Sequence, residues 1–366
     1  MKNSSARSTQ STAHQTPRKK WFKKKDQKTK ARKPLRVSLK SLLQLIVKVL
    51  LVFGLLFFLF QKGFLSPEAT REALKHWEFI LPSALALLLA NCLAAVRWHL
   101  LLHAQGIRQS FKRTFQLSWI GNFFNLALPG AVSGDFVKIF YIGKQTQGQS
   151  TRALGSILFD RVAGLSALII VSCIALIIQL LMTSNTPLPQ TLTWMIELAA
   201  TSVVFFYSYL FFMKERHDPL LKLLRWIDRR LPLFSAFTRV YESLRHYHHH
   251  KKIVIQGLLI SGLIHLVVGW SCFQLTSALG ETHLSLLSLY VILGLGLLVT
   301  AIPLAPGGIG TGNVAFLYLF HLLGSERGAD FFSLYVCVTL ALGSLGGLVY
   351  FRFRSHEPAV ALDLKT

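Results

Sequence analysis

Six segments of the chain are apolar over about 20 residues or more, which is the length a helix needs to cross the hydrocarbon core of a bilayer. They are residues 41–60, 80–102, 153–182, 192–213, 253–279 and 331–351. In lipid a backbone has to satisfy its own hydrogen bonds, so segments this long are expected to be helical. With 52% hydrophobic and 15% charged residues over 366 positions, the chain is too apolar for a soluble domain. We therefore predict an all-α polytopic membrane protein with about six full spans.

Two further apolar segments are interrupted by proline and glycine. PGAVSGDFVK, residues 129–138, follows the apolar residues 115–128, and PLAPGGIGTGNV, residues 303–314, lies between two apolar runs. Proline removes a helical N–H and glycine raises the entropic cost of the helix, so each helix must stop at the break. Paired breaks in corresponding halves indicate the central site of a transporter. We predict two re-entrant hairpins here.

The order of segments predicts inverted repeats. Each half, about 41–182 and 192–352, reads span, span, broken segment, span. Three full spans per half is an odd number, so the halves are inverted and the two hairpins enter from opposite faces of the membrane. The loop at 214–252 holds ten Lys/Arg against four acids, and cytoplasmic loops are typically basic. We expect a multi-pass protein of the cytoplasmic (inner) membrane with both termini in the cytoplasm.

Residues 1–40 form a basic tail that contains fourteen Lys/Arg and a single acid, Asp26. Its composition is polar, and we expect a disordered cytoplasmic segment close to anionic headgroups. The tail supplies much of the formal net charge of +24 but is not expected to form a folded nucleic-acid-binding domain. We therefore expect no nucleic-acid partner. Residues 41–352 would form the transmembrane domain, and 353–366 a cytoplasmic tail.

The loop at 214–252 is predicted to contain an amphipathic helix. In residues 219–234 apolar side chains recur at helical spacing, and Lys222, Arg225 and Arg229 occupy the other face. This pattern is typical of a helix that lies in the membrane interface.

The first break carries the polar residues of a short half-helix. Ser133, Gly134 and Asp135 stand at its start, and Lys138 follows one turn later. The positive end of such a half-helix attracts phosphate or carboxylate. The alternative is that Asp135 only caps the helix and pairs with Lys138. In the second break Thr311 or Asn313 would cap the equivalent half-helix.

Asp160 and Arg161 lie within the third span. Adjacent helical residues point about 100° apart, so each needs another partner. Arg97 and Lys138 are the candidates for Asp160, and Asp135 for Arg161. Ionisable residues within spans indicate function, but a structural ion-pair network is an equal alternative, and Arg97 could instead extend to the membrane surface. His265 is either a satisfied core histidine or a proton relay.

The chain shows no constellation typical of an enzyme. GxSxG, HExxH and phosphate-binding glycine loops are missing from the sequence. The four cysteines lie in apolar runs without a CxxC pair, and the histidine run at 246–250 has no spaced partner. We expect no metal and no cofactor.

Four motifs occur in order: RW at Arg97, LPGAVSGDFVK at 128–138, FDRVAGL at 159–165 and PLAPGGIG at 303–310. Together they resemble the flippase-like transmembrane domain of lysylphosphatidylglycerol synthases and its free-standing relatives, over about residues 40–352. The resemblance implies translocation of a lipid; a separate carboxy-terminal domain makes the aminoacylated lipid in the full synthases, and we expect no aminoacyl transfer here. Two residues depart from the family: Asn313 stands where glutamate is usual, and Lys138 where arginine is common.

We predict a substrate site of fourteen residues: Arg97, Pro129, Gly130, Ser133, Gly134, Asp135, Lys138, Asp160, Arg161, Pro306, Gly307, Gly308, Gly310 and Asn313. The protein would translocate or bind a phospholipid or a lipid-linked envelope precursor. One alternative is a membrane-embedded enzyme that acts on a lipid-linked substrate with Asp135 and Asp160. The other is an accessory subunit that docks on an envelope-lipid enzyme. Besides lipid, the partners we consider are that enzyme and a second copy of the chain.

Overall fold

The computed structural model describes residues 61, 67–127, 133–145, 149–182, 189–214, 217–230, 235–302 and 308–354. The chain divides into two units, Met1–Leu45 and Ile46–Thr366, and every described residue belongs to the second. The predicted first span at 41–60, the amino-terminal tail and residues 355–366 of the carboxy-terminal tail therefore lie outside the described residues.

The described part of the chain is helical and contains no strand. Its helices are α2 (Pro67–Lys75), α3 (Trp77–Ala104), α4 (Phe111–Ala127), α5 (Ser133–Gln145), α6 (Ser150–Met182), α7 (Gln190–Phe212), α8 (Pro219–Arg230), α9 (Ser235–Arg245), the 3₁₀ helix η3 (His246–His250), α10 (Lys251–Ala278), α11 (Leu286–Thr300), α12 (Thr311–His321) and α13 (Gly328–Arg354). Five are long and apolar enough to cross a membrane: α3, α6, α7, α10 with the preceding α9 and η3, and α13. The prediction of an all-α polytopic membrane protein is confirmed, and five of the six predicted spans appear within two or three residues of their expected bounds.

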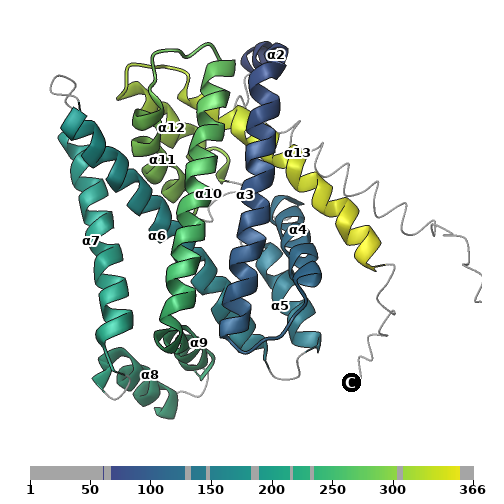
Figure 1. Ribbon diagram of the computed structural model, residues 1–366, viewed down its shortest axis with the longest axis vertical. Coiled ribbons are helices and arrows are strands. Elements are labelled where there is room, and N and C mark those ends of the chain that lie inside the picture. The colour runs from purple at the N-terminus through teal and green to yellow at the C-terminus, as the bar shows by residue number, and fades with distance from the viewer. Residues whose placement is uncertain are drawn as a thin grey trace, which may run out of the picture. The chain divides into compact units, whose positions relative to one another are not determined.

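Helices α3 and α10 pack against each other in opposite directions. The Oγ atoms of Ser83 and Ser271 lie 2.7 Å apart near one end of the pair. Toward the other end, Arg97 on α3 donates to Ser261 on α10, also at 2.7 Å. Residue numbers rise along one helix as they fall along the other, so the helices are antiparallel (Figure 1). Apolar side chains of α6, α11, α12 and α13 complete the main hydrophobic core around them.

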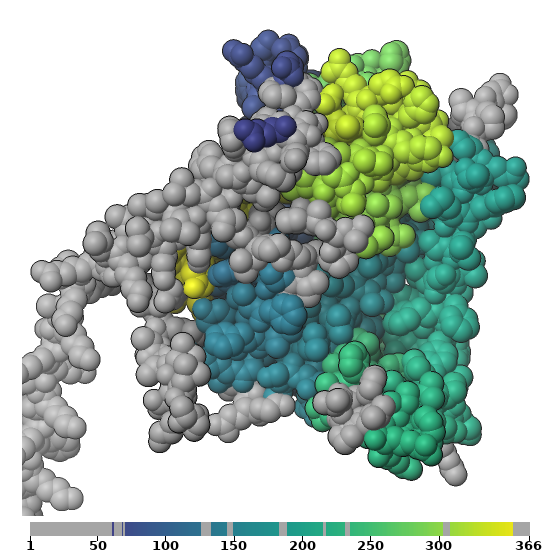
Figure 2. All heavy atoms as spheres, turned by 180° about the vertical axis from the view of Figure 1, so that it is seen from behind, coloured from purple at the N-terminus to yellow at the C-terminus, as the bar shows by residue number. Residues whose placement is uncertain are grey.

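Each predicted hairpin appears as a pair of helices at a proline–glycine break. Helix α4 packs on the C-terminal half of α3, where Asn122 Nδ2 donates to Asn91 Oδ1 at 2.8 Å. Helix α11 packs on the C-terminal half of α10, where Tyr290 Oη donates to the carbonyl of Leu266. Because α3 and α10 are antiparallel, the two hairpins lie toward opposite ends of this pair. Figures 1 and 2 show α4 and α5 at one level and α11 and α12 at another, while α13 runs from the level of α12 down to α4.

The spacing of the helices supports the repeat. Helix α5 begins at Ser133 and α12 at Thr311, and α6 begins at Ser150 and α13 at Gly328. Both pairs are separated by 178 residues. Asp135 and Asn313 stand the same distance apart and so occupy the same position in their half-helices. The two halves therefore place their breaks in the same way, although the sequence shows little residue-level repetition.

A buried ionic cluster fixes the loop between α7 and α10. Asp218, which is fully buried, accepts hydrogen bonds from Tyr209 Oη at 2.6 Å and Tyr241 Oη at 2.8 Å. Arg245 Nε lies 3.1 Å from Asp218 Oδ2, and its guanidinium donates to the carbonyls of Leu210 and Met213 at the end of α7. Those carbonyls have no partner within the helix, so Arg245 satisfies the C-terminus of α7. The predicted amphipathic helix appears beside this cluster as α8, with Leu220 and Leu223 exposed.

Candidate functional site

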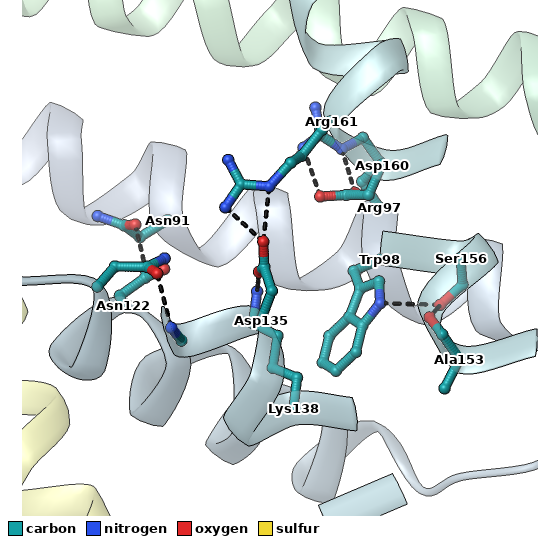
Figure 3. Close-up of polar contacts among 12 residues, drawn as sticks. Asn91, Arg97, Trp98, Asn122, Asp135, Lys138, Ala153, Ser156, Asp160 and Arg161 are labelled. Carbon is teal, nitrogen blue, oxygen red and sulfur yellow. Dashed lines mark hydrogen bonds and ion pairs between the residues drawn. The ribbon is translucent and has the colours of Figure 1, made fainter. Parts of the chain in front are cut away.

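Five charged side chains from three helices gather near the cytoplasmic end predicted for α3; we call them the charge cluster. They are Arg97 on α3, Asp135 and Lys138 on α5, and Asp160 and Arg161 on α6. Figure 3 shows them between the ribbons of these helices. All five were predicted from the sequence as candidate site residues.

Arg97 and Asp160 form a bidentate ion pair. Arg97 Nε donates to Asp160 Oδ1 at 2.7 Å, and Nη2 donates to Oδ2 at 3.0 Å. The third nitrogen, Nη1, donates to Ser261 on α10, so this guanidinium joins the first half of the chain to the second. Arg97 is 7% exposed, which excludes the alternative that its side chain reaches the membrane surface. Planar two-point pairing of this kind is among the stronger forms of charge-assisted hydrogen bonding.

Asp135 forms the second ion pair, with Arg161. Arg161 donates to Asp135 Oδ2 through Nε at 2.6 Å, and its Nη2 contacts the same oxygen. Lys138 Nζ lies 3.6 Å from the other oxygen of this carboxylate. The Asp135 side chain is 5% exposed, whereas that of Arg161 is 40% exposed. The pair therefore has a buried acidic half and a basic half that faces outward.

Trp98 forms one wall beside Lys138. Lys138 Nζ lies 5.0 Å from the centre of the Trp98 ring, within the range of a cation–π contact. The indole Nε1 donates to Ser156 Oγ at 3.3 Å, which fixes the orientation of the ring. The adjacent RW residues on α3 thus serve both pairs: Arg97 holds Asp160, and Trp98 faces Lys138.

Close packing of α4 on α5 sets the position of Asp135. A Cβ atom at Gly134 would overlap the carbonyl oxygen of Gly121 on α4, so only glycine allows this approach. The N–H of Gly134 donates to Asn125 Oδ1 at 2.7 Å, and Ser133 Oγ donates to the Phe124 carbonyl at 2.8 Å. Helix α5 begins at Ser133, which places Asp135 in the first turn, where the helix dipole favours a carboxylate.

The charge cluster has three basic and two acidic members. If all five are ionised, one positive charge is left within the group. The partly exposed Arg161 and the adjacent Lys138 can therefore accept an anion without removing Asp160 from Arg97. The arrangement is chemically suited to a phosphate monoanion or diester.

The second break is held differently. Asn313 Oδ1 accepts the N–H of Gly310 at 3.1 Å, and Asn313 Nδ2 donates to the Ala329 carbonyl and to Ser333 Oγ. As predicted, Asn313 helps to cap this half-helix, and it also ties α12 to α13. Gly308 and Gly310 have φ angles of 71° and 84°, a conformation that glycine adopts readily. These hydrogen bonds of Asn313 are with its own hairpin and α13, whereas the charge cluster is built from α3, α5 and α6.

The remaining predicted site residues, Pro129, Gly130, Pro306 and Gly307, lie outside the described residues. Sequence reasoning missed Ser261 and the asparagines 91, 122 and 125. Serine is common in membrane helices and does not indicate a site. Three asparagines within apolar segments, in contrast, are unusual enough to predict site residues. His265, left open as core residue or relay, donates from Nε2 to the Gly164 carbonyl at 2.9 Å, next to Arg97. Among the described residues no group of three or more His, Cys, Asp or Glu is placed to hold a metal.

Comparison with known proteins gave two matches. The model of the lysylphosphatidylglycerol synthase TM region matches residues 45–352. The UPF0104 membrane protein PH1989 of Pyrococcus horikoshii is 23% identical over 266 residues, which cover 68% of this chain and 78% of that protein. No solved structure matches the chain.

Proposed function

Because the chain belongs to the family of the lysylphosphatidylglycerol synthase transmembrane region, we propose that it binds the phosphate of a phospholipid or lipid-linked envelope precursor and carries that headgroup across the cytoplasmic membrane. The family takes its name from a synthase of lysylphosphatidylglycerol, and this supports a lipid-related role. The step from lipid contact to lipid movement rests on the geometry of the described residues.

The charge cluster is the observation that carries this proposal. Its surplus positive charge lies next to a guanidinium that is 40% exposed, inside a helical membrane domain. Charges inside a membrane domain are costly unless they are paired or used, and all five lie in ion pairs, with Asp135 shared between Arg161 and Lys138. A phosphate that approaches Arg161 and Lys138 would add the missing negative charge. Asp135 would hold both cations in position until it arrives.

The movement would come from the two halves. Helices α3 and α10 are antiparallel, and the broken hairpins lie toward opposite ends of the pair. In transporters built on inverted repeats, one half rocks against the other around a central site. Arg97 donates a hydrogen bond to Ser261 in the other half, so a movement of one half against the other would change the geometry of the charge cluster. The basic loops at 105–113 and 214–252 would face the cytoplasm.

The test is reconstitution into phosphatidylglycerol-containing liposomes with acyl-labelled fluorescent lipids and a membrane-impermeant reducing agent. We expect the wild-type protein to expose inner-leaflet lipid, and Arg161→Ala and Asp135→Asn to reduce the rate at least tenfold. Arg225→Ala is the matched control, since Arg225 is also a partly exposed, ion-paired arginine but lies on α8. Wild-type rates of lipid transport in both Arg161→Ala and Asp135→Asn would show that the charge cluster is not the headgroup site.

The same liposomes separate transport from chemistry. A membrane enzyme would leave a lipid of altered mass, whereas a translocator leaves each lipid unchanged. Mass spectrometry of the extracted lipids decides between the two. A protein that acts only as an accessory subunit would move no lipid when reconstituted alone.

A further inference from the structure

Three asparagines continue from the charge cluster toward the middle of the membrane domain; we call them the asparagine track. Asn125 on α4 accepts the N–H of Gly134, the residue that precedes Asp135. Asn122 lies one turn earlier on α4 and donates to Asn91 on α3 at 2.8 Å. Figure 3 shows Asn91 and Asn122 on the side of Asp135 away from Trp98. The track thus adds polar side chains on that side of the charge cluster.

The track runs away from the cytoplasmic end predicted for α3. Asn91 precedes Arg97 by six residues on the same helix, which is about 9 Å of helical rise. Asn125 lies near the C-terminal end of α4, next to the break. Asn125 therefore lies at the tip of the first hairpin.

Two amide groups of this track have hydrogen-bonding capacity that the described residues do not use. Asn91 Nδ2 donates to the Leu87 carbonyl and its oxygen accepts from Asn122. Within the part of the chain that the structure describes, neither the Asn122 carbonyl nor the Asn125 amide nitrogen has a partner, and both residues are partly exposed. An amide placed in hydrocarbon without a partner is costly. The site therefore offers one acceptor and one donor to a ligand.

We propose that the asparagine track is the path of the headgroup beyond the charge cluster, and that it selects headgroups that carry a hydrogen-bond donor beside the phosphate. The inference rests on the proposed function. A phosphate oxygen would accept from Asn125 Nδ2, and a hydroxyl or primary amine would donate to Asn122 Oδ1. Neutral amides bind an anion less tightly than arginine does, which allows the headgroup to leave again. Glycerol and ethanolamine headgroups meet this requirement, whereas choline carries no donor.

The competing explanation is that Asn91 and Asn122 only hold α3 to α4. Interhelical hydrogen bonds of this kind contribute modestly in membranes. Replacing both partners with leucine removes the bond and the polar path but leaves no buried polar group unpaired. Ser83→Ala with Ser271→Ala is the matched control, because that pair is also an interhelical bond of α3.

The first test compares phosphatidylglycerol with phosphatidylcholine, both acyl-labelled, in the liposome assay. We expect wild type to move phosphatidylglycerol faster, by roughly the 3- to 10-fold that one hydrogen bond contributes. Asn91→Leu/Asn122→Leu should lose that preference and slow both lipids while the protein keeps its thermal unfolding midpoint. The serine double variant should keep rate and preference. Equal rates for both lipids in wild type, or an unchanged preference in the leucine variant, would overturn the proposal.

A second test does not depend on transport. In a protein whose four native cysteines are replaced, Asn125→Cys should react with a small hydrophilic thiol reagent. Leu89→Cys, a position that is 51% exposed on the outer face of α3, should not. Slower reaction of Asn125→Cys in the presence of glycerol 3-phosphate would support headgroup access. A thiol at 125 that does not react would show that the track is closed to water and would overturn the path. If wild type moves no lipid while this thiol reacts, the proposed function fails but polar access to the track stands.

Discussion

At the scale of single residues, Arg97 shows how a charge is kept inside a membrane protein. Its guanidinium uses three nitrogens on two partners from two other helices, Asp160 on α6 and Ser261 on α10. Removing one partner of a buried ion pair leaves the other without compensation, and this is costlier than removing both.

We expect Arg97→Met to destabilise the protein by about 3 kcal/mol, the lower end of the range for a broken buried pair, because Asp160, whose side chain is 17% exposed, would be left without its partner. The double variant Arg97→Met/Asp160→Leu should recover most of that loss. The measurement is thermal or denaturant unfolding in detergent. Glu242→Gln, which breaks the exposed pair with Arg225, should change stability by no more than about 1 kcal/mol. A double variant as unstable as the single one would show that the pair does not act as a unit.

At the scale of helices, the first hairpin depends on the contact between Gly121 and Gly134. The break predicted from PGAVSGD is present, but its packing could not be predicted, since nothing in the sequence says which glycine meets a neighbouring backbone. The structure assigns that role to Gly134.

Gly134→Ala should therefore destabilise the hairpin and lower transport. Gly262→Ala on α10 is the matched control, because a Cβ there meets no atom within 4 Å. Alanine is the better helix former by up to about 1 kcal/mol, so the control should be neutral or slightly stabilised. The measurement is the unfolding midpoint of each variant. Equal midpoints for Gly134→Ala and Gly262→Ala would contradict the close contact between Gly134 and Gly121.

The loop cluster around Asp218 predicts a loss of stability in acid. Burial alone would raise the pKa of the Asp218 carboxyl, but hydrogen bonds from Tyr209, the Leu221 N–H and Tyr241, with the charge of Arg245, outweigh it and hold that pKa below its ordinary value. A lowered folded pKa contributes stability that is present above the unfolded pKa of about 3.9 and is lost as the pH falls below it. The unfolding midpoint between pH 6 and pH 3 should therefore fall more steeply for wild type than for Asp218→Asn. Parallel curves would show that Asp218 does not contribute.

Much of the fold could be predicted from the sequence, because span length and proline–glycine breaks are local properties. The pairings Arg97–Asp160 and Arg161–Asp135 were also within reach, since few opposite charges lie in the spans. The partners of Asn313 and the asparagine track were not, because they depend on which helix faces meet. The part of the predicted site that falls on residues 128–132 and 303–307 stays a prediction.

At the scale of the whole molecule, the loops after α3 and α10 should lie on opposite sides of the membrane. The two helices are antiparallel, and the first loop is basic, with Arg108, Lys112 and Arg113. In intact cells with a cysteine-free background, Thr282→Cys should react with an impermeant maleimide, and Arg108→Cys only after the membrane is opened. Labelling of both positions from one side would contradict the inverted arrangement.

The 178-residue spacing that relates the two halves has a further consequence. If the halves were identical, exchanging their conformations would give the same structure rotated by 180° about an axis in the membrane plane, and the inward-open and outward-open states would have equal free energy. Asp135 in one half-helix corresponds to Asn313 in the other, so the halves match in shape but not in charge. The protein should therefore rest in one orientation. A transmembrane voltage, worth about 2.3 kcal/mol per charge per 100 mV, would shift that preference. Lipid transport should therefore be faster at one sign of the voltage than at the other.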